Sequence, residues 1–229
     1  MKNFTFTKTL LSVLLVALFF SSCSTKSEST PIYISGVSLI QASPTTEKLD
    51  VYIADTKASK ADFSFGEKMD YLNAYSGDRT FRVTKKGSAD VISSAQLKLE
   101  PALGYSVFVV DKLATAQFLF LKDELVVPAA GKAKIRFVNL SPDGGSLSLG
   151  IAGKTTDVST AKAFKEYSNF ETIDAADKVA FNIKNSTGVV ETALVDVKIE
   201  SGMIYTIWVK GLKSATDDTK FGAAIFTHK

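Results

Sequence analysis

The chain has 229 residues, of which 45% are hydrophobic and 22% are charged, and this composition excludes a disordered chain and suffices for one or two domains. A single Cys excludes a disulfide framework within the chain, and a single His makes a His-based metal cage or a Ser-His-Asp triad hard to build. The formal net charge is only +3, with no stripe of Lys and Arg interleaved with aromatic residues, so nucleic acid is not expected as a partner.

Residues 1–22 have the pattern of a lipoprotein signal peptide. Lys2 and Lys8 form a positive start, and an uncharged apolar stretch of 11 residues, Leu10 to Phe20, follows. A membrane-spanning helix needs about 20 apolar residues, so we expect a removable signal. Its removal takes away two Lys and no Asp or Glu, and the formal net charge falls from +3 to +1.

The only Cys stands directly after this signal. Phe20, Ser21, Ser22 and Cys23 resemble the lipobox of bacterial lipoproteins, in which small residues precede a Cys that is acylated on sulfur. The resemblance implies lipid attachment at Cys23, a membrane partner, and an exported protein anchored to the cell envelope, at the periplasmic or surface face of the outer membrane. The small polar residues within 23–32 then predict a flexible tether.

The remainder of the chain contains an internal repeat of about 100 residues. Val37 to Ala54 aligns with Ile135 to Ala152 at an offset of 98, and Leu97 to Val109 aligns with Val197 to Val209 at an offset of 100. An offset that grows by only two residues indicates two full-length copies. We place them at residues 33–127 and 132–229.

Each copy alternates apolar and polar residues with a period of 2 and lacks a long stretch of period 3.6. Val195, Val197 and Ile199 alternate with Asp196 and Lys198, for example. Short β-branched and aromatic runs are separated by turns rich in Ser, Pro and Gly. The pattern predicts an all-β protein of two tandem immunoglobulin-like antiparallel β-sandwich domains.

A Tyr follows the end of an apolar strand at the same place in both copies. Tyr105 stands six residues after Leu99, and Tyr205 stands six residues after Ile199. This spacing resembles the tyrosine corner of immunoglobulin-like sandwiches, in which the phenol turns back to a backbone group. We expect Glu100 and Glu200 to lie in the corner turns and not to form a catalytic carboxylate pair.

Three segments point to one family. Arg136 to Gly145 form a strand and turn, Asp50 to Tyr52 lie in a second strand, and Gly202 to Gly211 form a late strand. Together they resemble bacterial exported lipoproteins built from immunoglobulin-like repeats, a family of Bacteroidota known only as a domain of unknown function. The resemblance covers most of residues 35–229 and implies a fold and an exported location.

The sequence offers little for catalysis, and we predict no enzyme, no cofactor and no metal. A nucleophile elbow, a P-loop, a dinucleotide fingerprint and a zinc-protease motif are all missing. His228 is the penultimate residue, and we expect a solvated tail side chain. Asp143 with Gly144 and Gly145, and the pair Asp217 and Asp218, lack the ligand spacing of a calcium loop.

Aromatic residues on strands are the candidate contact sites. If Tyr105 faces the core, period 2 places Phe108 on the opposite face, and Trp208 follows in the second copy. Tyr52 is also out of phase with its apolar neighbours. Such rings can stack on a sugar or contact a protein partner, and the alternative, which is the more common role, is packing between the two copies.

We therefore predict a non-enzymatic envelope lipoprotein that acts as a glycan-binding or adhesion module, with Trp208, Phe108 and Tyr52 as the contact residues. The alternative is a structural or assembly subunit of an envelope protein complex, in which the same rings pack against other subunits.

Overall fold

The computed structural model describes residues 33–228, which belong to one compact unit, Tyr33–Lys229. The predicted signal peptide (1–22), Cys23 and the tether (23–32) lie outside the described residues. Within the described part of the chain, no helix has the length and apolar character needed to cross a membrane.

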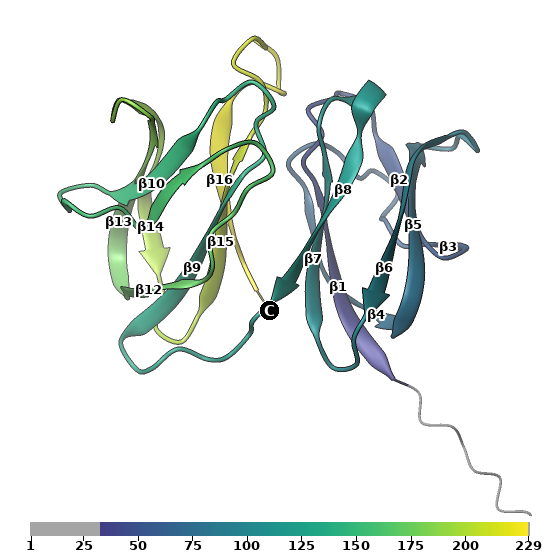
Figure 1. The fold of residues 1–229 in the computed structure, drawn as a ribbon, viewed down its shortest axis with the longest axis horizontal. Coiled ribbons are helices and arrows are strands. Elements are labelled where there is room, and N and C mark those ends of the chain that lie inside the picture. Colours follow the sequence, from purple (N-terminus) through teal and green to yellow (C-terminus); the bar gives the residue numbers. More distant parts are fainter. Residues whose placement is uncertain (1–32, 229) are drawn as a thin grey trace, which may run out of the picture. The chain divides into compact units, whose positions relative to one another are not determined.

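The first sandwich contains two four-stranded sheets, ordered β4-β1-β7-β8 and β3-β2-β5-β6 (Figure 1). A 3-10 turn, Leu113–Thr115, precedes the last strand. The strands are β1 (Ile34–Gln41), β2 (Leu49–Ile53), β3 (Thr56–Lys57), β4 (Lys68–Tyr75), β5 (Gly77–Lys85), β6 (Val91–Leu99), β7 (Gly104–Val110) and β8 (Gln117–Asp123).

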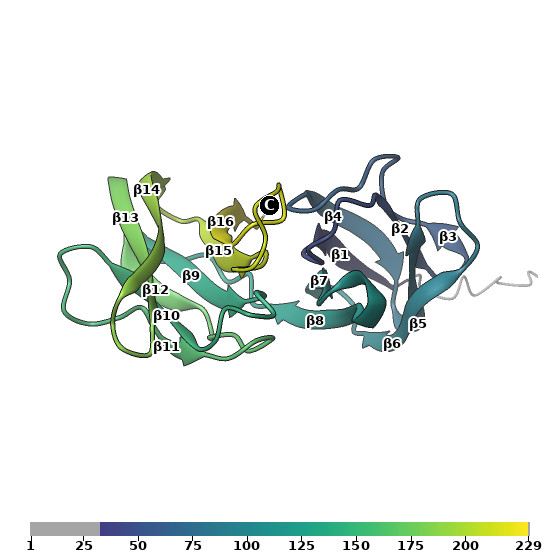
Figure 2. The same cartoon turned by 90° about the horizontal axis from the view of Figure 1, so that it is seen from above.

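The second sandwich repeats this arrangement, with sheets ordered β12-β9-β15-β16 and β11-β10-β13-β14. Figure 2 shows the two sheets of each sandwich as separate layers. The strands are β9 (Lys132–Asn139), β10 (Leu147–Ile151), β11 (Ser159–Lys162), β12 (Glu171–Asp174), β13 (Ala176–Asn185), β14 (Val190–Ile199), β15 (Ile204–Lys210) and β16 (Gly222–Thr227).

The predicted fold class is confirmed: the chain is all-β and contains two tandem β-sandwiches. The division at residues 127 and 132 stays a prediction, because Tyr33–Lys229 form a single compact unit. One detail differs from a purely antiparallel sandwich. β1 pairs with β7 in parallel, and β9 pairs with β15 in parallel, while the other pairs between named strands are antiparallel.

Alternation along the strands builds a core inside each sandwich. In β7, Tyr105, Val107 and Val109 join the core of the first sandwich, and Tyr205 and its alternate neighbours do the same in the second. Burial of these apolar side chains stabilises each pair of sheets at about 25 cal/mol per Å² removed from water. The face assignment made from period 2 is therefore confirmed for β7 and β15.

Both predicted tyrosine corners are present. The backbone N–H of Glu100 donates to the Tyr105 hydroxyl at 3.0 Å, and the backbone N–H of Glu200 donates to the Tyr205 hydroxyl at 3.0 Å. Each bond satisfies a backbone donor where the chain crosses between sheets. Glu100 and Glu200 thus occupy corner turns, as expected.

A third apolar cluster lies between the sandwiches and forms what we call the joint. It draws side chains from β1, β7 and β8 of the first sandwich and from β9, β15 and β16 of the second. The corresponding sheets of the two repeats thus pack face to face through the joint. Its buried members are Ile40, Ala42, Phe108, Val110, Leu121, Val138, Leu140 and Trp208.

Candidate functional site

The structure places two of the three predicted contact residues inside the joint. Trp208 is 2% exposed and Phe108 is fully buried, and their rings meet edge to face with centroids 6.3 Å apart. Both side chains point away from the core of their own sandwich, as the period-2 alternation along the strands predicted. They pack against the other repeat, so the expected ligand contact at Trp208 and Phe108 is replaced by the alternative, packing between the two copies.

Tyr52 keeps a partly exposed side chain on β2. The guanidinium of Arg82 on the neighbouring strand lies 5.3 Å from the centre of its ring. The second repeat has Gly150 at this position, and a Cβ there would come within 2.7 Å of the Asp157 carboxylate. The second sandwich therefore has no aromatic counterpart of Tyr52, and this ring is available for a contact in the first sandwich alone.

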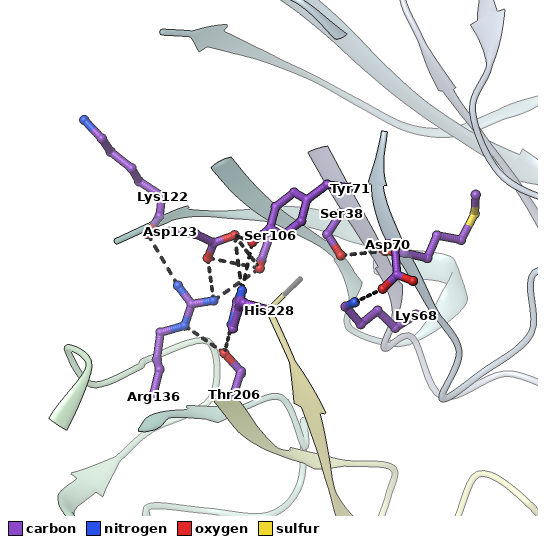
Figure 3. A network of polar contacts seen from close by, with 11 residues as sticks. Ser38, Lys68, Asp70, Tyr71, Ser106, Lys122, Asp123, Arg136, Thr206 and His228 are labelled. Atoms are coloured by element: carbon purple, nitrogen blue, oxygen red, sulfur yellow. Dashed lines mark hydrogen bonds and ion pairs between the residues drawn. The ribbon is translucent and has the colours of Figure 1, made fainter. Parts of the chain in front are cut away.

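Beside the apolar joint lies a buried polar network that the sequence did not predict (Figure 3). The Arg136 guanidinium and the Asp123 carboxylate approach to 2.8 Å with side chains only 2% and 0% exposed. Asp123 also accepts hydrogen bonds from the hydroxyls of Tyr71, at 2.6 Å, and Ser106, at 2.9 Å. An ion pair that links the two sandwiches is thus fully removed from water.

His228 completes this network, and the expectation of a solvated tail residue is wrong. Its ring nitrogens lie 2.8 Å from the Tyr71 hydroxyl and 2.8 Å from the Thr206 hydroxyl. The backbone N–H of His228 donates to Ile204, which continues the pairing beyond β16 and holds the terminus in place. Strand pairing and burial, which sequence position could not reveal, overrule the usual fraying of a chain end.

Burial also controls ionisation in the network. It lowers the pKa of His228 to about 4, helped by the positive charges of Arg136 and Lys68 and opposed by Asp123. It raises the pKa of Tyr71, and the negative charge of Asp123 adds to this effect. At neutral pH the imidazole is therefore uncharged, and Arg136 and Asp123 form the ion pair.

The network holds a hydroxyl, an imidazole and a carboxylate, but its geometry is that of a structural connection. Ser106 donates to Asp123, and Thr206 contacts His228 while receiving a hydrogen bond from Arg136. Both hydroxyl residues are 0% exposed. A substrate needs access to a nucleophile, and these hydroxyls face only other protein groups.

The candidate calcium residues also serve the fold. The Asp143 carboxylate accepts hydrogen bonds from the backbone N–H groups of Lys213 and Ser214, at 2.8 and 3.1 Å. Asp217 accepts from Thr219. Among residues 33–228, no group of three or more His, Cys, Asp or Glu side chains is placed to hold a metal ion.

Equivalent edges of the two sandwiches each carry an open groove. Groove 1 in the first sandwich has a volume of about 590 Å³, and groove 2 in the second has a volume of about 730 Å³. Ile53 and Ile151, repeat partners at the end of β2 and β10, lie in the respective grooves. Groove 1 is lined by Ile53, Thr56, Lys57, Leu72, Tyr75 and Arg79, and groove 2 by Ile151, Lys154, Asp157, Ile173, Asp174 and Lys178, among others.

Tyr75 and Arg79 are binding candidates that the sequence analysis missed. Tyr75 ends β4 and is 64% exposed, the most exposed aromatic residue of the described chain. Its strand alternates weakly, so the orientation of the Tyr75 side chain could not be predicted from period 2.

The sequence did contain a signal for the joint. β7 and β15 have apolar residues on both faces, which is typical of a strand covered on both sides, and the structure buries both strands along almost their whole length.

Comparison with solved structures finds likenesses of very low identity. One is a carbohydrate-binding module of family 26 from Eubacterium rectale in complex with maltoheptaose, with 11% identity, a TM-score of 0.27, and coverage of 86% of this chain and 97% of that one. Another is a family 41 carbohydrate-binding module from a streptococcal virulence factor, with 13% identity, a TM-score of 0.25, and coverage of 82% and 96%. TM-scores this low carry no argument about function. No curated protein matches the chain.

Family comparison is more informative. The model of a domain of unknown function, DUF4397, matches residues 35–150, which is just over half of the chain and includes the whole first sandwich together with β9 and most of β10. The chain therefore belongs to the DUF4397 family.

Proposed function

We propose that this protein is an exported, lipid-anchored and non-enzymatic module that binds glycan chains through grooves 1 and 2. The observation that carries the proposal is the duplication of the groove at the equivalent edge of both sandwiches. The joint already occupies Trp208 and Phe108, so a ligand must bind elsewhere, and the two grooves are open surfaces that it could reach.

The lining of the grooves supports a hydroxyl-rich ligand. The lining of each groove combines apolar residues, such as Leu72 in groove 1 and Ile173 in groove 2, with residues whose side chains donate or accept hydrogen bonds. A sugar presents apolar ring faces and hydroxyls together, which matches such a surface.

Two grooves on one compact unit favour a polymeric ligand. When one groove has bound a repeating chain, the second binds at a high effective concentration, so two weak sites together give firm retention. Adhesion of a cell to a polysaccharide surface needs this property.

The binding test uses the purified protein and a panel of soluble polysaccharides, measured by calorimetry. Thr56→Phe fills groove 1 and Thr155→Phe fills groove 2, since both residues line the grooves and are exposed. Each should weaken binding at least about tenfold, and the double variant should weaken it further. Thr187→Phe, in the exposed turn after β13, is the matched control.

A panel that yields no saturable binding refutes the glycan proposal. Binding that survives in the double variant refutes the groove assignment. A defined envelope complex that needs the grooves, with no polysaccharide bound, favours the structural alternative.

The lipid anchor rests on the sequence before residue 33, and its test is separate. Cells supplied with radiolabelled palmitate should label the wild-type protein and not the variant Cys23→Ala. The variant should also leave the membrane fraction, since acyl chains provide the attachment. Equal labelling of both proteins would refute attachment at Cys23.

A further inference from the structure

Groove 1 differs from groove 2 in charge. Its lining includes two cations, Lys57 and Arg79, and no carboxylate. Lys57 is already paired with Asp50 at 2.5 Å, and Asp55 on the adjoining turn is paired with Arg82 at 3.4 Å. Among the described residues, Arg79 takes part in no ion pair, so its charge is the one left uncompensated in groove 1.

The guanidinium of Arg79 is held in a defined orientation. Its Nε donates to the carbonyl of Tyr75 at 2.7 Å, Nη2 donates to the carbonyl of Ser76 at 2.7 Å, and Nη1 donates to the carbonyl of Asp78 at 3.0 Å. A guanidinium has about five N–H donors, so donors on both Nη atoms remain available. Neutral carbonyls fix the side chain without cancelling its charge, which prepares it to bind an anion.

An exposed aromatic residue shares this part of groove 1. Tyr75 belongs to the lining of groove 1, is 64% exposed, and is the residue whose carbonyl receives Arg79 Nε. An exposed ring and a guanidinium on the same short connection between β4 and β5 are the two groups that an acidic sugar needs, one for its ring face and one for its acidic group.

Groove 2 provides an internal contrast. Its lining contains Asp157, Glu171 and Asp174, and Asp174 occupies the position that Tyr75 has in the first repeat, at the end of β12. Two of these carboxylates are paired, Asp157 with Lys184 and Asp174 with Lys132, and the lining also includes Lys154 and Lys178. The lining of groove 2 contains neither an Arg nor an aromatic residue, so the combination of Arg79 and Tyr75 is specific to groove 1.

We infer that groove 1 binds an acidic sugar, with a carboxylate or sulfate group on Arg79 and the sugar ring stacked on Tyr75. This inference rests on the proposed function and specifies the ligand class for one of its two grooves.

The test measures binding of the full protein to four probes by calorimetry: oligogalacturonate, heparin oligosaccharide, neutral dextran oligosaccharide and poly-glutamate. Arg79→Gln should lower the affinity for the acidic probe at least about tenfold, because a charge-assisted bidentate contact is lost. Arg79→Lys keeps the positive charge and should therefore retain part of the affinity for the acidic probe. The matched control Lys112→Gln removes an exposed cation that belongs to the lining of neither groove, and its affinity should stay within about twofold of the wild type.

Loss of the three carbonyl contacts in Arg79→Gln could itself disturb the connection between β4 and β5, so a second variant is needed. Tyr75→Ala removes a ring that is mostly exposed, and it should lower the affinity for the acidic probe while the unfolding midpoint stays close to that of the wild type. Oligogalacturonate and heparin distinguish a carboxylate from a sulfate as the bound anion.

The failing outcomes are distinct. Equal affinity for dextran and oligogalacturonate, unchanged in Arg79→Gln, overturns the acidic-sugar inference and leaves the proposed function standing. Equal binding of poly-glutamate shows that charge alone is recognised and also overturns it. Failure of every saccharide overturns the inference and the proposed function together.

Discussion

The sharpest structural prediction concerns Asp123→Asn in the polar network. The substitution keeps the size of the side chain and removes the charge that faces Arg136 at 2.8 Å. Arg136 is 2% exposed and would then be a buried cation without a counter-charge. Breaking one partner of a buried pair costs about 3–5 kcal/mol in the free energy of unfolding. At about 2–4 °C per kcal/mol for a unit of this size, the unfolding midpoint should fall by roughly 6–20 °C.

The fluorescence of Trp208, the only Trp, follows the unfolding of this region, because Trp208 lies in the joint next to the network. Urea unfolding followed by Trp fluorescence gives the free energy directly. Asp174→Asn is the control, since it breaks only the exposed pair with Lys132 and should leave the midpoint nearly unchanged. The double variant Asp123→Leu with Arg136→Met should recover most of the loss, because no buried charge remains. A loss below about 1 kcal/mol in Asp123→Asn would show that Arg136 reaches water and would refute the buried pair.

Three further predictions concern stability. Trp208→Ala should lower the free energy of unfolding by about 3–5 kcal/mol and leave polysaccharide binding intact; abolished binding with normal stability would contradict its place in the joint. Tyr105→Phe and Tyr205→Phe should each cost about 1–3 kcal/mol by leaving a backbone N–H without its acceptor, and unchanged midpoints would argue against the corners. Because the pKa of His228 is lowered from 6.5 to about 4, the unfolded state takes up the proton first on acidification. The free energy of unfolding should therefore be insensitive to this residue above pH 6.5 and fall by about 3 kcal/mol between pH 6.5 and 4. His228→Asn should remove this part of the pH dependence, and identical profiles for both proteins would refute the assignment.

The features that depend on local pattern could be predicted. Alternation of period 2 identified the strands and the core-facing side of Tyr105, and the spacing of Tyr205 from the preceding strand identified the second corner. Repetition at an offset near 98 indicated two equivalent sandwiches before any contact was known. These features were accessible because backbone geometry alone sets the alternation of faces along a strand.

The candidate sites were predicted less well. The sequence showed that Phe108 and Trp208 point away from their own cores, and it could not show what covers them. Tyr75 and Arg79 line one groove because a one-residue connection at Ser76 carries the chain from the end of β4 in one sheet to the start of β5 in the other. Strand order and edge position decide such an arrangement, and neither is encoded in a local window of residues.

By itself, the sequence determined the all-β class, the duplication and the corner turns, since the order of residue types along the chain reveals each of them without knowledge of any contact. Only the tertiary structure decided that the two repeats join through Phe108 and Trp208, and that His228 is buried beside Asp123 and Arg136. The physical reason is that burial of a side chain depends on its partner surface, and here that surface belongs to residues about 100 positions away, in the other repeat.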